Sequence, residues 1–354
     1  MFGHYKTYLS LFVLSALTSW ILTPLVRKLA FRVGAIDFPN ERKVHKDPMP
    51  RLGGLAIFIG MCLPWIGLYI IENFITITFQ NYEKLWLKLI ASSISILLLG
   101  AYDDIKGANA TQKFTVQFAV AFFLYSSGLQ ITQLSNPFGE PIPLEWLSMP
   151  VTVLWLVGIT NAINLLDGID GLATGVTGCI ALSLAVINIA NGNVIVALLT
   201  LSLAGACFGF LPHNFSPTSI FLGDTGSLFM GFMLAGIGVL SLFKTTTLSF
   251  IAVPFLVFAV PFYDTITVII RRARAGNPIF AADRSHLHHR LLALGWGQRG
   301  ASLFLCGISV CMGGVAVFLT LNQARDLTLF AWGFVLAVLG GVGLLSRRAL
   351  NRRS

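Results

Sequence analysis

The chain has 354 residues, of which 55% are hydrophobic and only 11% are charged, and its formal net charge is +9. Soluble proteins carry about 25% charged residues, so this composition excludes an ordinary soluble domain. Apolar runs of about 20 residues recur along the whole sequence, and each is long enough to cross a bilayer. We therefore expect an all-α, polytopic integral membrane protein with a single transmembrane domain over residues 1–354.

Hydropathy predicts about eleven transmembrane helices. In chain order they are expected at about 7–29, 54–74, 85–102, 113–130, 149–163, 172–190, 194–212, 227–243, 248–270, 301–321 and 327–346. The sixth and seventh are separated only by Asn191-Gly192-Asn193, a composition typical of turns. The loop from Thr132 to Pro150 has the turn-rich composition of a small hairpin.

The basic residues indicate the orientation of these helices. Most of the 24 Lys and Arg residues lie in loops that follow odd-numbered helices, or in the C-terminal tail. Because basic loops tend to stay in the cytoplasm, we expect the N-terminus outside and the C-terminus in the cytoplasm. The cytoplasmic loops are then expected at about 30–53, 102–113, 163–172, 212–227 and 271–300.

One polar stretch, NAINLLDGIDG at 161–171, interrupts the apolar pattern. Its polar side chains recur at three-residue intervals: Asn161, Asn164, Asp167 and Asp170. On a helix this spacing would align them on one face, whereas Gly168 and Gly171 predict that the helix opens into a loop here. We interpret the stretch as one wall of a site for a cation and a phosphorylated ligand.

Further polar clusters fall on the same expected cytoplasmic face. They are NERKVHKDPMPRLGG at 40–54, YDDIKG at 102–107, the segment from Pro212 to Ser227 with its LGDTGS end, and DRSHLHHR at 283–290. The expected outer loops hold no comparable cluster. Polar groups concentrated on one face predict a site at that membrane boundary.

The residue types in these clusters suit metal-assisted phosphoryl transfer to a lipid. Hard oxygen ligands for Mg²⁺ or Mn²⁺ are offered by Asp103, Asp104, Asp167, Asp170 and Asp224, with Asn164 and Asn214. Cationic and donor groups for a polyanionic substrate are offered by Lys43, Lys46, Arg51, Lys113 and the His286–Arg290 run. Phosphoryl transfer requires this combination. Since a soluble phosphotransferase needs no membrane helices, we expect a lipid phosphate as the second substrate.

Several of these features also have a structural interpretation. Asp103 and Asp104 could be a solvated loop pair, and Asp224 could cap the following helix. The histidines could bind zinc, although their basic neighbours favour an anion. Asp264 is an ionisable residue at membrane depth, which makes it functional by default unless Tyr263 or an arginine simply pairs with it.

Together the motifs resemble those of the polyprenyl-phosphate N-acetylhexosamine-1-phosphate transferases of the WecA/TagO type, which are related to MraY and belong to glycosyltransferase family 4. The matching pieces are KVHKDPMPRLGG, DDIKG, NAINLLDGIDGLA, NFSPTSIFLGDTGS and ADRSHLHHRLLALG, in the family order over about residues 34–295. The resemblance implies ten or eleven helices with an active-site cleft on the cytoplasmic face, and a transmembrane domain that is catalytic.

The resemblance also implies roles at the reacting phosphates. It implies that Asp224 ligates Mg²⁺, with Mn²⁺ as the alternative ion, and that Asn164 lies beside it. Asp103 and Asp104 would form the acid pair at the phosphates, and Lys113 would hold the diphosphate.

Further roles follow from the same resemblance. The nucleotide would be surrounded by Asp167, Asp170, Asn214 and Phe221, with the Phe221 ring stacked on the uracil. Lys43 and Lys46 match basic positions of the family's first cytoplasmic loop, which implies that they bind substrate. In the histidine run we expect His288 to be catalytic, and the substrate to be bound by His286, His289 and Arg290. The HLHH run departs from the three consecutive histidines of MraY, which favours a UDP-N-acetylhexosamine over a UDP-muramoyl-peptide.

The expected reaction is transfer of N-acetylglucosamine-1-phosphate from UDP-GlcNAc to a polyprenyl (undecaprenyl) phosphate, giving polyprenyl-diphospho-GlcNAc and UMP. This would be the first membrane step of cell-surface polysaccharide synthesis, in the plasma membrane of a bacterium. Asp103 would accept the proton of the lipid phosphate, or Asp104 would attack first as a nucleophile.

Three alternative functions stay open. Two are MraY-like transfer of phospho-MurNAc-pentapeptide and transfer of another UDP-N-acetylhexosamine. The third, of another class, is secondary transport of an anionic metabolite, which would show inverted repeats and a site near the midplane. No nucleic-acid partner is expected, and whether the chain forms a homodimer is left open.

Overall fold

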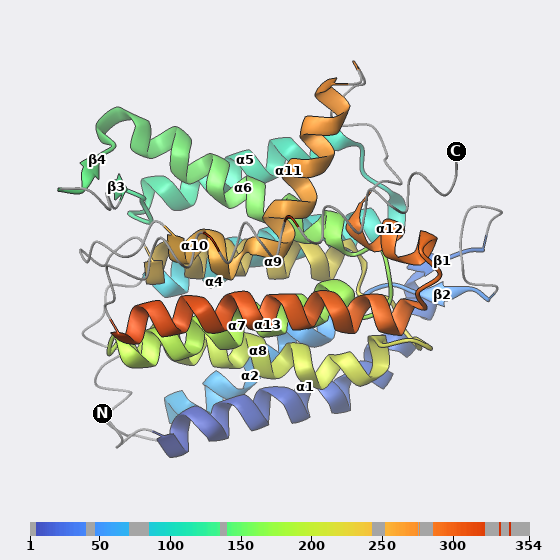
Figure 1. The fold of residues 1–354 in the computed structure, drawn as a ribbon. Helices are drawn as coiled ribbons and strands as arrows, with labels where there is room; N and C mark the ends of the chain where they lie inside the picture. Colours follow the sequence, from blue (N-terminus) through green and yellow to red (C-terminus); the bar gives the residue numbers. More distant parts are fainter. Residues whose placement is uncertain are drawn as a thin grey trace.

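The computed structural model describes residues 5–39, 47–70, 85–134, 140–242, 252–274, 276, 286–322, 333 and 340. In these residues the protein is a bundle of long helices with two short β-hairpins (Figure 1). The helices are α1 (Tyr5–Val33), α2 (Gly53–Ile70), α4 (Leu85–Lys106), α5 (Ala110–Ser126), η2 (Glu145–Leu147), α6 (Ser148–Leu166), α7 (Leu172–Ala190), α8 (Val194–Asn214), α9 (Gly223–Leu242), α10 (Ala252–Val257), α11 (Ala259–Arg274), α12 (Leu287–Ala293) and α13 (Gln298–Asn322). The strands are β1 (Ile36–Asp37), β2 (Met49–Pro50), β3 (Gln133–Leu134) and β4 (Ile142–Pro143).

The expected all-α, polytopic membrane protein is confirmed. Among the described residues, 7 helices are long and apolar enough to cross a membrane: α1, α4, α6 together with η2, α7, α8, α9 and α13. The turn expected at Asn191–Asn193 does separate α7 from α8. The helix expected at 327–346 falls outside the described residues apart from 333 and 340, so the number eleven stays a prediction.

Helix α9 forms the centre of the bundle. It packs against α2, α4, α6 and α7, and 89% of its apolar span is buried, against 28% for α1. A helix that is apolar all round is stable only when it is surrounded, and the side chains of Phe229 and Phe232 on α9 are almost wholly buried. Because Asp224 lies in the first turn of this central helix, the polar end of α9 is enclosed by neighbouring helices.

A glycine allows α4 to approach α9 closely at this end. A Cβ atom on Gly100 would lie 2.4 Å from the Asp224 carbonyl oxygen, a distance that no other residue type could accommodate without a shift of the backbone. The close approach places the last turn of α4, with Asp103 and Asp104, against the first turn of α9.

Several boundaries differ from the sequence-based expectation, among them the start of α9 at Gly223 instead of about 227, the end of α4 and the middle of the helix expected at 248–270. The polar residues 102–106 belong to α4 rather than to a loop, because the helix continues until Gly107, which has a left-handed φ of 78° and donates its N–H to the Asp103 carbonyl oxygen. The helix expected at 248–270 is broken into α10 and α11 at Phe258. Pro261 explains the break, since it has no N–H to donate to the Val257 carbonyl oxygen.

The two hairpins lie at opposite ends of the bundle (Figure 1). The predicted hairpin at 132–150 is confirmed by the pairing of β3 with β4. The pairing of β1 with β2 was not predicted. The chain that follows β2 runs beside Phe221, which donates its N–H to the Pro50 carbonyl oxygen and accepts from the Gly53 N–H. The β1–β2 hairpin is thereby attached to the segment that leads into α9.

Candidate active site

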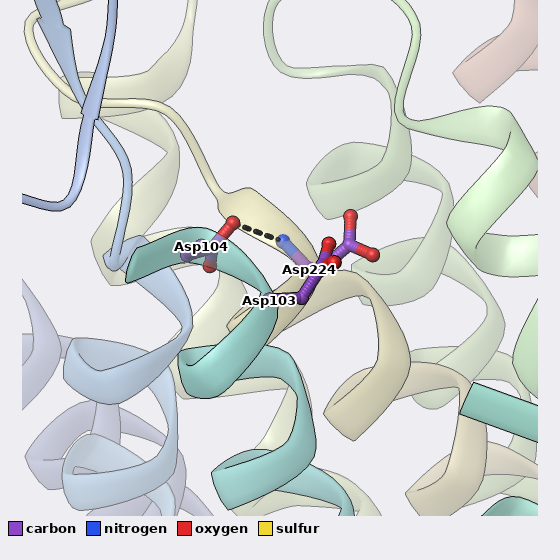
Figure 2. A group of neighbouring side chains, drawn as sticks. All are labelled: Asp103, Asp104 and Asp224. Atoms are coloured by element: carbon purple, nitrogen blue, oxygen red, sulfur yellow. Dashed lines mark hydrogen bonds between the residues drawn. The ribbon is translucent and has the colours of Figure 1, made fainter. Parts of the chain in front are cut away.

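Three carboxylates converge where α4 meets α9. Asp103 and Asp104 come from the last turn of α4, and Asp224 comes from the first turn of α9 (Figure 2). One carboxylate oxygen from each residue lies within 4.8 Å of the others. Asp224 lies about 120 positions from the other two in the sequence, so the three carboxylates meet only because α4 packs against α9.

Asp104 caps the N-terminus of α9. Its Oδ1 accepts the backbone N–H of Asp224 at 3.0 Å, and its Oδ2 accepts the Thr225 N–H at 2.9 Å and the Thr225 hydroxyl at 2.6 Å. A carboxylate at a helix N-terminus satisfies free N–H groups and interacts favourably with the helix dipole. The structural alternative stated from the sequence gave this cap to Asp224; the capping carboxylate is instead that of Asp104 on α4.

Lys113 bridges the other two carboxylates. Its Nζ lies 2.8 Å from Asp103 Oδ2 and 2.5 Å from Asp224 Oδ2. Asp103 Oδ1 also accepts the Ala108 N–H at 2.6 Å. Helix α5 begins just before the lysine with a capping box formed by Asn109 and Gln112. The α4–α5 connection is thus rigid, and it directs the lysine ammonium group between two acids.

Asn164 orients Asp224 from the side of α6. Its Nδ2 donates to Asp224 Oδ1 at 3.1 Å and to the Ser227 hydroxyl at 2.8 Å. One turn earlier, Asn161 donates to Gln117 Oε1 at 2.6 Å. The predicted stripe therefore begins on α6, where it makes interhelical contacts, and leaves the helix after Leu166.

The carboxylate cluster has the donor chemistry that a divalent cation requires. In the described part of the chain, Asp103, Asp104 and Asp224 are the group whose ligand atoms converge in this way. The Lys113 ammonium group between two of them shows that the cluster accommodates positive charge. Hard carboxylate oxygens with further open positions suit Mg²⁺ or Mn²⁺. The residues present therefore fit such an ion.

A cavity of about 620 Å³ opens beside the cluster. Eight residues that were named for the site from the sequence line it: Arg51, Asp104, Asp167, Asp170, Asn214, Phe221, Asp224 and His289. Ligand sites commonly have volumes of about 300–1,000 Å³. The cavity is thus large enough for a nucleotide-sized ligand, and its wall is rich in carboxylates.

The loop between α6 and α7, residues 167–171, forms one wall of this cavity. Withdrawal of the Asp167 carboxyl from water raises its pKa well above the usual range, and the charges of Asp224, Asp104 and Asp170 raise it further. The backbone of Asp170 is held by α13: its N–H donates to Gln298 Oε1 at 3.2 Å, and its carbonyl oxygen accepts the Ser302 hydroxyl at 2.9 Å.

The segment between α8 and α9 forms another part of the wall. Asn214, the last residue of α8, accepts the Thr174 hydroxyl at 2.9 Å and donates to the Ile220 carbonyl oxygen at 3.2 Å. These bonds tie α7, α8 and the segment before Phe221 together. The Phe221 side chain lines the cavity on backbone that is bonded to the β2–α2 connection.

The sequence comparisons decide which family this arrangement belongs to. A model described as glycosyl transferase family 4 matches residues 86–242. A protein of Bacillus subtilis (strain 168) described as a probable undecaprenyl-phosphate N-acetylglucosaminyl 1-phosphate transferase is 42% identical over 297 residues, which are 83% of this chain and 80% of the relative. The chain belongs to glycosyl transferase family 4. This confirms the resemblance stated from the motifs to the polyprenyl-phosphate hexosamine-1-phosphate transferases of that family.

Two further relatives are less similar to this chain than the Bacillus subtilis protein. The decaprenyl-phosphate N-acetylglucosaminephosphotransferase of Mycobacterium tuberculosis (strain H37Rv) is 35% identical over 316 residues, covering 82% of this chain and 77% of the relative. A phospho-N-acetylmuramoyl-pentapeptide-transferase of Staphylococcus aureus is 28% identical over 296 residues, covering 78% of this chain and 87% of the relative. The names of these relatives thus differ in the sugar that is transferred.

Six residues that were predicted to belong to the site are not among those that line the cavity. They are Asp103, Lys113, Asn164, His286, His288 and Arg290. Lys113 and Asn164 contact Asp224, and Asp103 contacts Lys113. The other three belong to the histidine segment at the start of α12. Lys43 and Lys46 lie outside the described residues, so their predicted roles stay predictions.

The histidine segment is stacked ring to ring. His288 is buried, and burial together with the neighbouring His289 lowers its pKa to about 3, so its imidazole is neutral at physiological pH. The rings of His286 and His288 are nearly parallel at 5.8 Å, and His289 follows at 4.3 Å from His288. Among the described residues, the converging metal-ligand group consists of carboxylates; zinc binding by the histidines gains no support.

Some residues at the cavity had not been assigned a role from the sequence. Asp37 and Asp47 line it, and Asp37 pairs with Arg51 at 3.3 Å. Gln298 was also missed, because it acts on the backbone of Asp170 and no motif marks such a contact. The KVHKDPMPRLGG motif contains Asp47 and Arg51 and was the available signal for this part of the wall.

Proposed function

We propose that the chain transfers N-acetylglucosamine-1-phosphate from UDP-GlcNAc to a polyprenyl phosphate in the membrane, giving polyprenyl-diphospho-GlcNAc and UMP. The observation that carries this proposal is the three-carboxylate cluster with Lys113 beside a nucleotide-sized cavity that Asp104 and Asp224 line. The relatives at 42% and 35% identity are named for N-acetylglucosamine, whereas the muramoyl-pentapeptide relative is at 28%. This order favours UDP-GlcNAc as the donor.

In this proposal the cluster binds Mg²⁺, with Mn²⁺ as the alternative ion. Asp224 would hold the ion with Asp103 and Asp104, and the ion would neutralise charge that develops on the diphosphate. Asn164 donates to Asp224 in the structure, which supports a role in orienting that carboxylate. Its predicted direct contact with the ion stays a prediction. Lys113 would move its charge from the carboxylates to the phosphates when the substrate binds.

The hydrogen bonds distinguish the two neighbouring acids. Both oxygens of Asp104 accept from the start of α9, so a nucleophilic Asp104 would have to give up the cap of that helix. Asp103 bonds to Lys113 and to the Ala108 N–H, and the lysine can leave it for a phosphate. We therefore propose the direct route, in which Asp103 accepts the proton of the lipid phosphate and the lipid oxygen attacks the sugar-bearing phosphorus.

The cavity wall would bind the UDP moiety. Asp167 and Asp170 offer acceptors for the ribose and uracil, Asn214 offers an amide, and Phe221 offers an aromatic face. His289 also lines this cavity. The roles predicted for these residues from the family are compatible with the positions that they occupy.

The orientation is also a proposal. Arg27, Lys28 and Arg32 lie in the last turns of α1, shortly before the cavity-lining Asp37, and Arg271, Arg272 and Arg274 lie in the last turn of α11. Basic residues favour the cytoplasmic side, where UDP-sugars are available. We infer that the cavity faces the cytoplasm, with the N-terminus outside, in the plasma membrane of a bacterium.

The test is release of UMP by the purified protein in detergent with Mg²⁺ and polyprenyl phosphate. UDP-GlcNAc, UDP-GalNAc and UDP-muramoyl-pentapeptide are offered separately. The proposal predicts lipid-dependent release of UMP from UDP-GlcNAc above the other two. Release from the muramoyl substrate alone would keep the chemistry but overturn the sugar, and release from none, together with uptake of a metabolite into liposomes, would favour the transporter.

A further inference from the structure

Asp264 of α11 remains without a role in this scheme, although its side chain is almost wholly buried. Its carboxylate accepts the Leu287 backbone N–H at 2.6 Å and lies 2.8 Å from His286 Nδ1. Leu287 is the first residue of α12, and His286 is its N-cap. The carboxylate thus fixes both the start of α12 and the adjacent imidazole ring. Donation from His286 to this carboxylate oxygen requires the imidazole tautomer with its proton on Nδ1.

The contact continues from His286 to the wall of the cavity. The His286 ring faces the His288 ring in a nearly parallel arrangement, with an interplanar angle of 7°. The His288 ring in turn packs on Gly168: a Cβ atom at that position would lie 2.1 Å from His288 Nε2. Gly168 belongs to the 167–171 loop and lines the cavity.

His288 has no hydrogen bond that would fix its ring independently. Both ring nitrogens are buried, and neither finds a hydrogen-bond partner among the described residues. Buried polar atoms of this kind are rare and call for an explanation. The position of the ring is therefore set by packing, against the neighbouring rings of His286 and His289 and against Gly168. A shift of His286 would pass directly to the loop that carries Asp167.

We propose that Asp264 is a positioning residue, which locks His286 and, through the His288 ring, sets the 167–171 loop at the nucleotide side of the cavity. The link to donor binding rests on the proposed function, whereas the mechanical link from α11 to the loop does not. A simple capping residue would act on the Leu287 N–H alone. The proposal differs because it requires the imidazole of His286 as an intermediate.

Three single variants separate these roles. In Asp264→Asn the amide oxygen can still accept the Leu287 N–H, but the amide NH₂ group then faces Nδ1, so the His286 ring loses its carboxylate acceptor and keeps a hydrogen bond there only in the other tautomer, with its proton on Nε2. His286→Asn removes the ring and keeps a residue that is favourable at a helix N-cap. Thr267→Val is the matched control on α11, because it removes a hydroxyl that donates to the Asp264 carbonyl oxygen and leaves the carboxylate in place.

The first readout is backbone hydrogen exchange of the purified protein in detergent. We expect Asp264→Asn and His286→Asn to raise exchange about tenfold in residues 167–171 as well as at the start of α12, and Thr267→Val to leave both segments unchanged. Faster exchange in α12 with an unchanged loop would overturn the proposal and reduce Asp264 to a cap. If Asp264→Asn does not fold, His286→Asn alone decides, since it breaks the same link beyond the cap.

The second readout is UMP release at varied UDP-GlcNAc. We expect Asp264→Asn to raise KM for the donor about tenfold, and the double variant with His286→Asn to be no worse than His286→Asn alone, because the two changes break one link. If the increases in KM of the two single variants multiplied in the double variant, Asp264 would not act through His286. Absence of UMP release from the wild-type protein would refute the proposed function and leave the exchange measurement to decide this inference.

Discussion

The two ends of the bundle satisfy their buried polar groups in different ways. At the end away from the cavity, Asn188 of α7 donates to the Leu184 carbonyl oxygen at 2.7 Å and to the Ser241 hydroxyl of α9 at 2.8 Å, and it accepts from Asn193 at 3.3 Å. These neutral groups satisfy one another, as is usual between membrane helices. At the cavity end, carboxylates approach within 4.8 Å of one another.

This difference separates a structural polar network from a functional one. Crowded like charges are unfavourable, and they persist only where binding of a cation or substrate offsets the repulsion. A neutral amide network has no such requirement, because its donors and acceptors are already matched. Substitutions at the cavity end should therefore reduce activity more than stability, and substitutions at the opposite end should do the reverse.

The largest loss of activity among the variants that test this comparison is expected for Asp103→Asn. Loss of a general base reduces turnover by about 10²- to 10⁴-fold, and the fold should persist because Lys113 keeps its contact with Asp224. UMP release and the melting temperature in detergent measure the two effects. A variant with more than half of the wild-type turnover would show that Asp103 does not accept the proton.

Asp104→Ala sharpens the contrast within the carboxylate cluster. It removes the acceptor of three hydrogen bonds at the start of α9, and buried donors left without a partner cost about 1–3 kcal/mol. We expect a clear loss of thermal stability that Asp103→Asn does not show. Equal melting temperatures for the two variants would refute the capping role.

Asn188→Leu tests the opposite end. Loss of an interhelical hydrogen bond in a membrane protein costs about 0.6 to 1.7 kcal/mol, so the melting temperature should fall moderately. Turnover per folded molecule should stay at the wild-type value, since the network lies at the far end of α7 and α9. A severalfold loss of turnover at a temperature where the variant is fully folded would remove the distinction between the two ends.

For Asp167→Asn we expect a smaller change in the melting temperature, and this change is an increase. Burial and neighbouring carboxylates raise the pKa of Asp167 in the folded protein, so its ionisation destabilises the fold as the pH rises above the unfolded-state value of about 4. The variant should therefore melt at a higher temperature than wild type at pH 7.5, and the gap should close toward pH 4. A difference in melting temperature that does not change with pH would show that ionisation of Asp167 does not cause it. Binding of the UDP-sugar donor should weaken in either case.

Much of this fold was predictable because apolar runs report membrane helices directly. The opening of the Asn161–Gly171 stretch after α6 was also predictable, since Gly168 and Gly171 stand among the polar residues. Helix ends were less so: polarity changes at Tyr102, yet α4 continues to Lys106. The hydropathy of a helix reports where it leaves the apolar layer, and its backbone hydrogen bonds continue beyond that point.

The partners of the site residues could not be read from the sequence. The cap that Asp104 forms on α9 and the contact of Asp264 with His286 join different helices, and no local period encodes such contacts. Asp264 illustrates the limit well. Its position at membrane depth marked it as functional by default, with Tyr263 or an arginine as the structural alternative. In the structure its carboxylate instead contacts a histidine and a backbone amide.

The most direct test of the central claim, that the carboxylates at the cavity end perform metal-assisted phosphoryl transfer, is a Mg²⁺ titration of UMP release by wild type and Asp224→Asn. UDP-GlcNAc and polyprenyl phosphate are held at saturation. The account predicts release by wild type that saturates with Mg²⁺ and stops with EDTA, and a folded Asp224→Asn variant that has lost nearly all activity at every Mg²⁺ concentration. Turnover that resists EDTA, or an Asp224→Asn variant with most of the wild-type turnover, would contradict it.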